Sequence, residues 1–214
     1  MSLLKDLFLF FIFAFFTACS SSSIERRYNQ SYTEKESKGK YQRFSSENDE
    51  ETYRAEFDEE PVEDHPVNVK EFVEENNRIE NSPIKLSERE RVMMEIVKYL
   101  NTPYLYGGNN KMGIDCSAFT QNVFQKSLNV KLPRTAKEQF AKGEKIKRKN
   151  LLKFGDLIFF DTTKNSYPGH VGIYLGDYLF AHASFSKGVT VSSLHSSYFK
   201  TRYVGARREV KIRN

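Results

Sequence analysis

Residues 20–83 contain too few apolar side chains to build a hydrophobic core, so any folded domain must lie elsewhere in the chain. About one residue in five of this segment is apolar, and its 9 basic and 17 acidic residues give a net charge of −8. Such a composition does not bury enough apolar surface to offset the entropy lost on ordering. We therefore expect a disordered acidic tether, with a root-mean-square reach of roughly 40 to 50 Å, in which residues 67–79 form at most a transient helix, since Asn76 and Asn77 argue against a stable one.

Residues 1–19 have the layout of an export signal. A polar start containing Lys5 precedes the apolar run 7–16, which is too short for a membrane-spanning helix of about 20 residues. Small residues then precede Cys19, and this pattern resembles the lipobox of bacterial lipoproteins, whose cysteine is lipidated and becomes the mature N-terminus. Cys19 is therefore the expected lipidation site. The alternative is an ordinary cleaved signal in which Cys19 is incidental.

Residues 84–214 carry a net charge of +13 and are long enough to form a folded domain. A Ser-x-x-Glu capping box at Ser87, followed by apolar residues at helical spacing, predicts a first helix that Pro103 ends. A second helix is predicted to begin at Cys116, and a third follows a capping box at Thr135.

Beyond residue 149 the pattern changes to short apolar and β-branched runs, which predict strands. The turns between these runs are too short for helical crossovers, so the strands should pair antiparallel. The predicted fold class is α+β, with N-terminal helices packed on a five- to six-stranded antiparallel sheet. The predicted strands cover residues 157–160, 171–175, 178–183, 189–193 and 203–210.

Cys116 and two histidines form a candidate nucleophilic site. Cys116 lies at the start of a predicted helix, where unpaired amides and the helix dipole favour a thiolate. His170 and His182 fall in neighbouring predicted strands. A cysteine, a histidine base and a polar group that orients the base form the triad that attacks an amide carbonyl. Taken alone, Cys116 is more typical of a buried core thiol, because free cysteine is among the most buried residue types; the two histidines favour the nucleophile instead.

Six short motifs follow one another in this domain: PYLYGG at 103–108, GIDCS at 113–117, LPR at 132–134, GDL at 155–157, GHVGIY at 169–174 and FAHAS at 180–184. Together they resemble the NlpC-type papain-like peptidases of the bacterial cell wall, over about residues 88–208. The resemblance implies a papain-like fold and cleavage of peptide bonds in the stem peptides of peptidoglycan.

The resemblance also implies roles for individual residues. Cys116 matches the nucleophile, His170 the general base, and His182 the polar residue that orients the base. Tyr104 matches the tyrosine that lines the site, whose hydroxyl helps to hold the oxyanion. The substrate-binding residues expected from the same motifs are Asp115, Ser117 and Arg134. No metal and no organic cofactor is expected.

Thr135 and Ala136 stand where some of these peptidases carry an Asp-Ser pair that recognises a free N-terminal amine. This difference favours endopeptidase action on the intact wall over the trimming of short peptides. The predicted protein is thus a lipid-anchored cysteine peptidase that hydrolyses an amide bond in peptidoglycan stem peptides or cross-links. Its expected location is the bacterial cell envelope, with the outer membrane, facing the periplasm, as the favoured place.

Other functions fit parts of the sequence. Cys116, His170 and His182 are acceptable zinc ligands, although their spacing lacks a Cys-x-x-Cys or His-x-x-x-His pair. A non-catalytic wall-binding lipoprotein on the same fold would have lost the cysteine or the first histidine, and a thiol acyltransferase would share all the motifs. The basic domain raises nucleic acid as a partner, but an exported chain meets anionic wall polymers first. Peptidoglycan and, through the anchor, the membrane are the expected partners of a monomer.

His182 can orient His170 only if both side chains lie on the same face of the sheet, which we expect to be the face toward the helix that begins at Cys116. Directly opposed residues of an antiparallel pair share a face, and their numbers sum to a constant, which must here be even. A regular two-residue turn gives an odd sum. We therefore predict a three-residue loop at 176–178, or an equivalent bulge, that sets Gly172 opposite His182 and leaves His170 diagonal to it.

Overall fold

The computed structural model describes residues 60–80, 86–164 and 166–213. The predicted signal peptide at 1–19, the lipidation site Cys19 and most of the predicted tether lie outside the described residues. Within the described ranges, no helix combines the length and the apolar character needed to cross a membrane.

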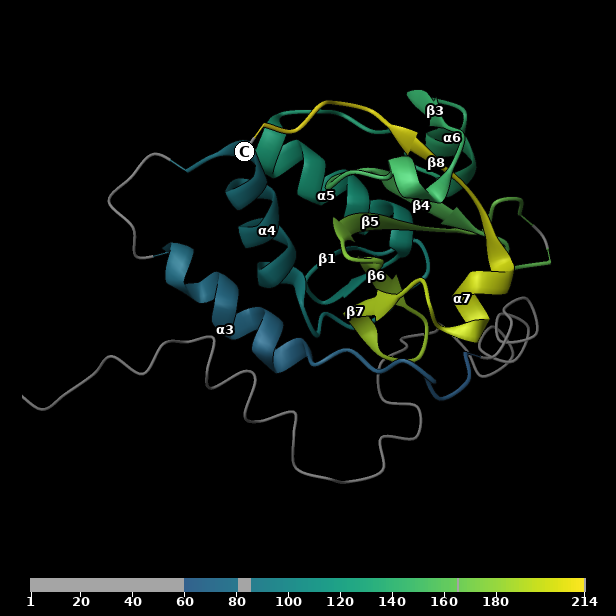
Figure 1. Ribbon diagram of the computed structural model, residues 1–214, viewed down its shortest axis with the longest axis horizontal. Helices are drawn as coiled ribbons and strands as arrows, with labels where there is room; N and C mark the ends of the chain where they lie inside the picture. Colours follow the sequence, from purple (N-terminus) through teal and green to yellow (C-terminus); the bar gives the residue numbers. More distant parts are fainter. Residues whose placement is uncertain (1–59, 81–85, 165, 214) are drawn as a thin grey trace, which may run out of the picture. The chain divides into compact units, whose positions relative to one another are not determined.

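A six-stranded antiparallel sheet with helices on both sides makes up the domain (Figure 1). Its strand order is β3-β8-β4-β5-β6-β7, and this confirms the predicted α+β class. The strands are β3 (Glu144–Ile146), β4 (Leu157–Phe160), β5 (His170–Gly176), β6 (Leu179–Ser184), β7 (Gly188–Ser193) and β8 (Tyr203–Arg208). The helices are α3 (Val69–Glu80), α4 (Glu88–Tyr99), α5 (Cys116–Leu128), α6 (Ala136–Phe140) and α7 (Ser197–Arg202), with a 3-10 turn at Lys149–Leu151 and a small hairpin of β1 (Asn109–Asn110) and β2 (Gly113–Ile114).

The three predicted helices are present: two follow the capping boxes predicted at Ser87 and Thr135, and the one predicted to begin at Cys116 does so, capped by Asp115. Ser87 caps α4 and Thr135 caps α6, both in complete capping boxes. Asp115 caps α5 by accepting a hydrogen bond of 2.7 Å from the backbone amide of Ala118. This cap fixes Cys116 as the first residue of α5.

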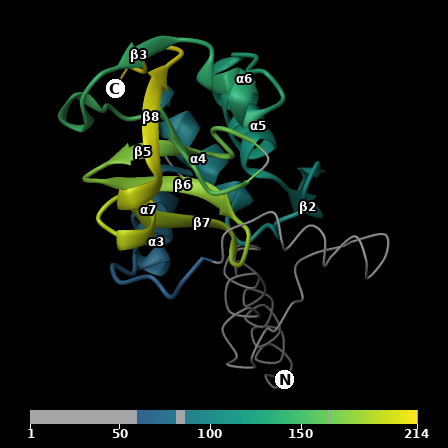
Figure 2. The ribbon, with the colours of Figure 1, turned by 90° about the vertical axis from the view of Figure 1, so that its right-hand side faces the viewer.

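Two hydrophobic clusters cover opposite faces of the sheet. In β4, Leu157 and Phe159 pack with α4 and α5, whereas Ile158 and Phe160 pack with α7. All four side chains are fully buried, because alternate residues of a strand point to opposite faces and both faces are covered. Figure 2 gives the view at right angles to Figure 1, with α7 beside β6 and β7.

The C-terminal strand β8 lies inside the sheet, between β3 and β4. A buried ion pair fastens it there, since Arg208 donates two hydrogen bonds of 2.7 Å to the carboxylate of Asp156 at the start of β4. Asp156 is fully buried, and its charge is stable in that position only with its partner in place.

The structure differs from the sequence-based prediction at the C-terminal end of the predicted tether. Residues 69–80 form the stable helix α3, which contacts α4. Val73 of α3 is buried, and Val67 and Phe72 pack against the main core. The composition of residues 20–83 is an average, and it hides this short stretch in which apolar residues recur on one side of a helix.

The hairpin between β5 and β6 has the predicted register. Ile173 pairs with Ala181 and Tyr174 with Phe180, so the numbers sum to an even constant. The equivalent bulge, and not a three-residue loop, produces this register: a two-residue turn at Asp177 pairs Gly176 with Leu179, and the register then shifts between Gly176 and Tyr174. A side chain at Gly172 would lie 3.3 Å from Cβ of His182, as expected for opposed positions.

Candidate active site

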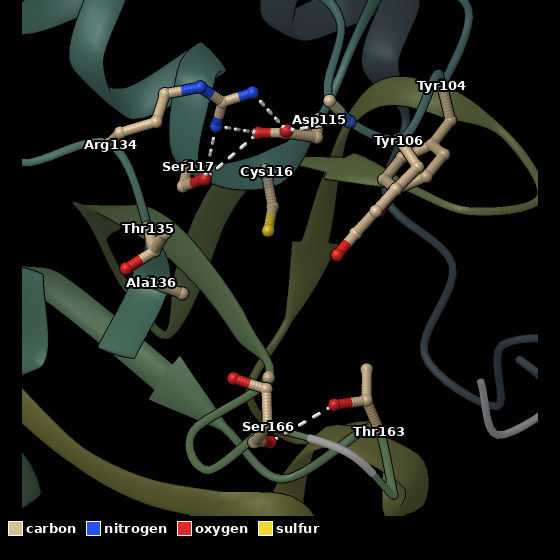
Figure 3. A pocket seen from close by; sticks show the side chains of 12 residues that line it. Tyr104, Tyr106, Asp115, Cys116, Ser117, Arg134, Thr135, Ala136, Thr163 and Ser166 are labelled. Carbon is tan, nitrogen blue, oxygen red and sulfur yellow. Dashed lines mark hydrogen bonds and ion pairs between the residues drawn. The ribbon is translucent and has the colours of Figure 1, made fainter. Parts of the chain in front are cut away.

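Five of the side chains indicated by the sequence line one pocket of about 500 Å³ (Figure 3). Thr135, Ala136, Thr163, Ser166 and Gly169 line the same pocket. The five are Tyr104, Asp115, Cys116, Ser117 and Arg134. The helix α5 therefore presents its first turn to an open cavity large enough for part of a peptide chain.

The sulfur of Cys116 points into this pocket from the N-terminus of α5 (Figure 3). Two backbone amides donate hydrogen bonds to it, one from Ser117 and one from Val171 of β5. The pairing of β5 with β6 ends at Ile173–Ala181. Val171 comes before this ladder in β5, and its amide donates to the sulfur of Cys116. The thiol thus lies against the backbone of the residue that follows His170.

Burial raises the pKa of the Cys116 thiol to about 12, and the nearby carboxylate of Asp115 adds to the rise. The two amides and Arg134 lower it by less. The expectation that the helix terminus makes this group a thiolate is therefore not met, because the cost of a buried charge exceeds the stabilisation from the amides. Cys116 rests as a neutral thiol.

His170 and His182 form a buried pair of imidazoles. Nε2 of His170 lies 2.9 Å from Nδ1 of His182, and the two ring planes are nearly perpendicular, at 88°. On its other side, Nε2 of His182 lies 3.0 Å from Oγ of Ser192 in β7. Burial lowers the pKa of His170 to about 4 and also lowers that of His182, so both rings are neutral near pH 7.

The two imidazoles share one face of the sheet, as predicted, but the prediction that it is the face toward α5 is wrong. His170 contacts the ring of Phe160, and His182 contacts the rings of Phe180 and Phe199, all in the cluster with α7. The odd-numbered residues of β5 and β6 fill the α5 side instead.

Asp115 holds together the polar side chains of the first turn of α5. Arg134 donates to both of its oxygens, at 3.0 and 2.6 Å, and to Oγ of Ser117 at 3.0 Å. Oγ of Ser117 and the amide of Gly107 donate to the same carboxylate. Asp115 is buried and Arg134 is 40% exposed. Of this group, Arg134 is therefore the charged side chain that can reach a ligand in the pocket.

The two tyrosines of the PYLYGG motif differ in their environment. Tyr104 is buried and packs against the ring of Phe185, and it also lines the pocket. Tyr106 is 64% exposed at the pocket and is therefore not a core residue.

Two polar residues that the sequence analysis passed over belong to this site. Ser192 bonds His182, and Glu63 bonds Ser192. The alternation of side chains along a strand could have predicted Ser192, because it is even-numbered like the two histidines. It pairs with Phe180, which lies on the same face of β6 as His182. Glu63 lies far away in the sequence, and nothing in its surroundings there signals the contact. Within the described part of the chain, no group of three or more His, Cys, Asp or Glu is arranged to hold a metal ion.

Comparison with known proteins gives a consistent result for this domain. The model of the NlpC/P60 family matches residues 101–208. The chain is 39% identical over 132 residues to the murein DD-endopeptidase MepS/murein LD-carboxypeptidase of Escherichia coli strain K12, an alignment that covers 62% of this chain and 69% of that protein. It is 42% identical over 118 residues to the gamma-DL-glutamyl hydrolase of Bacillus subtilis strain 168, covering 55% of this chain and 28% of that protein.

The solved structure of an NLP/P60 family protein of Staphylococcus aureus, described as similar to lipoprotein, superposes with a TM-score of 0.53 at 35% identity. The match covers 63% of this chain and 45% of that one. The chain thus spans less than half of the Staphylococcus and Bacillus proteins but more than two thirds of the Escherichia protein. With its α+β architecture and its ordered motifs, the chain belongs to the NlpC/P60 family.

Proposed function

We propose that this protein is a cysteine peptidase that hydrolyses an amide bond in peptidoglycan stem peptides or cross-links. The observation that carries the proposal is the position of the Cys116 sulfur. It faces an open pocket at a helix N-terminus and lies beside a strand whose first residue, His170, is hydrogen-bonded to a second imidazole. Nucleophile, base and orienting group are the three parts that acyl transfer through sulfur requires.

In the proposed mechanism His170 takes the proton of the Cys116 thiol as the sulfur attacks the amide carbonyl. A free thiolate is not needed in the buried site, because proton transfer and attack occur together from the neutral pair. The amide of Cys116 and the hydroxyl of Tyr104 hold the oxyanion. His170 then gives its proton to the leaving amine, and water hydrolyses the acyl-enzyme and regenerates the thiol.

The surroundings of the sulfur favour cleavage within a peptide. Thr135 and Ala136 form the wall opposite the tyrosines (Figure 3), and neither carries a carboxylate that would bind a free N-terminal amine. Arg134 offers a positive charge at the pocket, although Asp115 already engages it, and suits the carboxylate-rich stem peptides of the wall. The Escherichia relative is named a murein DD-endopeptidase and murein LD-carboxypeptidase, which supports the same substrate class.

We also propose that residues 1–19 act as a signal peptide, that Cys19 is lipidated, and that the domain works as a monomer at the outer membrane, facing the periplasm. This part of the proposal rests on the sequence pattern alone. Mass spectrometry of the N-terminal peptide, isolated from cells that express the chain, should find a lipid on Cys19. An unmodified Cys19 within a longer N-terminal peptide would contradict it.

The activity is tested on purified sacculi and on a soluble cross-linked stem peptide, with mass spectrometry of the products. The 214-residue chain should release fragments that identify the bond cut, and Cys116→Ser should release none while it melts at the same temperature. Hydrolysis by Cys116→Ser at the wild-type rate would end the proposal. Transfer of an acyl group from a lipid, with the stem peptide left intact, would instead support the thiol acyltransferase.

A further inference from the structure

An acidic strap, which we define as residues 60–68, lies along β6, which carries the orienting histidine His182, and along β7. Glu60 accepts hydrogen bonds from Ser184 and Ser186 at the end of β6, and Asp64 accepts one from the backbone amide of Ser197 at the start of α7. Between these two anchors, Glu63 reaches Ser192 of β7. In Figure 1 the strap runs from α3 past β7 toward α7.

Glu63 ends an unbroken chain of hydrogen bonds that starts at His170. One of its oxygens accepts from Oγ of Ser192, and the other forms a salt bridge of 3.2 Å with Nζ of Lys187. Its side chain is only 13% exposed. Ser192 and His182, the two intermediate groups, are buried with at most 1% of their surface exposed, so water does not compete for their hydrogen bonds.

The carboxylate of Glu63 determines which group is the donor and which the acceptor in every hydrogen bond of this series. A carboxylate only accepts hydrogen bonds, whereas a hydroxyl and a neutral imidazole can each donate one and accept another. Ser192 must therefore give its proton to Glu63, and its oxygen then accepts from Nε2–H of His182. A neutral His182 protonated on Nε2 has a bare Nδ1, which accepts from Nε2–H of His170.

These donor and acceptor roles determine which ring nitrogen of the proposed base, His170, carries a proton. A neutral His170 with its proton on Nε2 has an unprotonated Nδ1, and that lone pair is the one free to take the thiol proton. Without an acceptor at the far end, Ser192 is free to donate to His182 and to reverse the whole chain. Reversal would place a proton on Nδ1 of His170 and leave the site without a base.

We propose that Glu63 is a positioning residue that, through Ser192, sets the tautomers of His182 and His170 and so keeps Nδ1 of His170 free to act as the base. The proposal rests on the proposed function for the role of His170. It gives the strap a part in the active site, although the strap lies far outside the matched family region in the sequence. Lys187 contributes by fixing the carboxylate and by lowering the pKa of His182.

The test measures tautomers and activity separately, in the 214-residue chain. In ¹⁵N-histidine NMR near pH 7, the wild type should show His170 and His182 protonated on Nε2. Glu63→Gln, whose amide can donate as well as accept, should shift both rings toward protonation on Nδ1. The same variant should lower kcat on a soluble stem peptide by about 10- to 100-fold with little change in KM.

Glu60→Gln is the matched control, because Glu60 lies on the same strap and bonds Ser184 and Ser186, which are not members of the hydrogen-bond series from Glu63 to His170. It should keep the wild-type tautomers and kcat. Ser192→Ala should reproduce the shift seen in Glu63→Gln, and combining the two changes should add little. Wild-type tautomers in both Glu63→Gln and Ser192→Ala would overturn the proposal. Because the NMR signal needs no turnover, it decides the matter even if no wall peptide is cleaved.

Discussion

Two opposing effects act on the pKa of the Cys116 thiol: the helix N-terminus lowers it and burial raises it. Its place at the N-terminus of α5 favours a thiolate, but burial raises the pKa of the thiol to about 12. The proposed reaction accordingly starts from a neutral thiol and a neutral imidazole, and the charge on sulfur appears only as the substrate is attacked. Residue type and spacing predicted the nucleophile, but they could not predict its resting charge, because burial is a property of the folded chain.

This conflict predicts how Cys116 reacts with iodoacetamide, which alkylates only the thiolate. The rate of labelling should be low at pH 7 and should rise about tenfold per pH unit up to at least pH 9, because the pKa of the thiol lies near 12. The measurement is labelling against pH, followed by mass spectrometry of the peptide that contains Cys116. A rate that already levels off below pH 8 would show that the amides of Ser117 and Val171 outweigh burial.

The buried imidazole of His170 predicts a loss of stability in acid. Burial lowers its pKa from 6.5 to about 4, so between these two values the unfolded chain binds the proton and the folded chain does not. The contribution of this group is complete above pH 6.5 and falls by as much as about 3 kcal/mol as the pH drops to 4. The free energy of unfolding from urea titrations should therefore fall less steeply in His170→Gln than in the wild type. Equal slopes would mean that His170 is not buried as a neutral ring.

At the scale of elements, the β5–β6 hairpin shows which features of a strand pair the sequence can predict. The requirement that two even-numbered histidines share a face predicted an even register, and the bulge near Gly176 provides it. The same alternation placed Val171 and Ile173 on the other face, and since a helix covers apolar residues, it also implied that α5 lies opposite the imidazoles. The prediction was wrong because it required the imidazoles to lie on the face of the sheet that the helix of the nucleophile covers, whereas they lie on the face that α7 covers.

Short elements were the part of the fold that the sequence did not predict. β3 has three residues and α7 has six, and segments of this length have little stability of their own. They form because the sheet holds them, β3 by pairing with β8 and α7 by burying Tyr198 and Phe199. The helices α4, α5 and α6 were predictable because their first turns are stabilised by capping residues next to them in the sequence. These residues are Ser87, Asp115 and Thr135.

Gly172 is the position in this hairpin at which a single methyl group should be felt in the active site. A Cβ there would lie 2.8 Å from the ring of Phe180 and 3.3 Å from Cβ of His182. Gly172→Ala should lower the free energy of unfolding by about 1 to 3 kcal/mol through overpacking, and should reduce kcat because His182 must move. Thermal melts and peptide hydrolysis measure the two effects.

The control for this change is Gly205→Ala in β8, whose added Cβ would meet only the ring of Phe140 at an ordinary 3.4 Å. It should be tolerated in both measurements. If Gly172→Ala were as stable and as active as Gly205→Ala, the space between the two imidazoles would have no importance for the site.

At the scale of the whole molecule, the boundary of the folded unit lies earlier than the composition indicated. The strap and α3 pack on the domain that begins with α4, so we expect the unit needed for activity to include residues 60–80. A protein that begins at residue 60 should match the 214-residue chain in melting temperature and in kcat on a soluble stem peptide. A protein that begins at residue 84 should melt at a lower temperature and lose activity, because it lacks Glu63 and the buried Val73. Equal activity of the two shortened proteins would remove residues 60–83 from the working unit.

The place of β8 between β3 and β4 has a consequence for the order in which the sheet can form. β8 is the last strand in the sequence, yet β3 and β4 both pair with it. Before β8 is in place, Asp156 lacks its ion pair with Arg208, and the edges of β3 and β4 expose unpaired hydrogen-bonding groups that can associate with other strands. We therefore expect the sheet to close late and in one step, once the C-terminal strand is available.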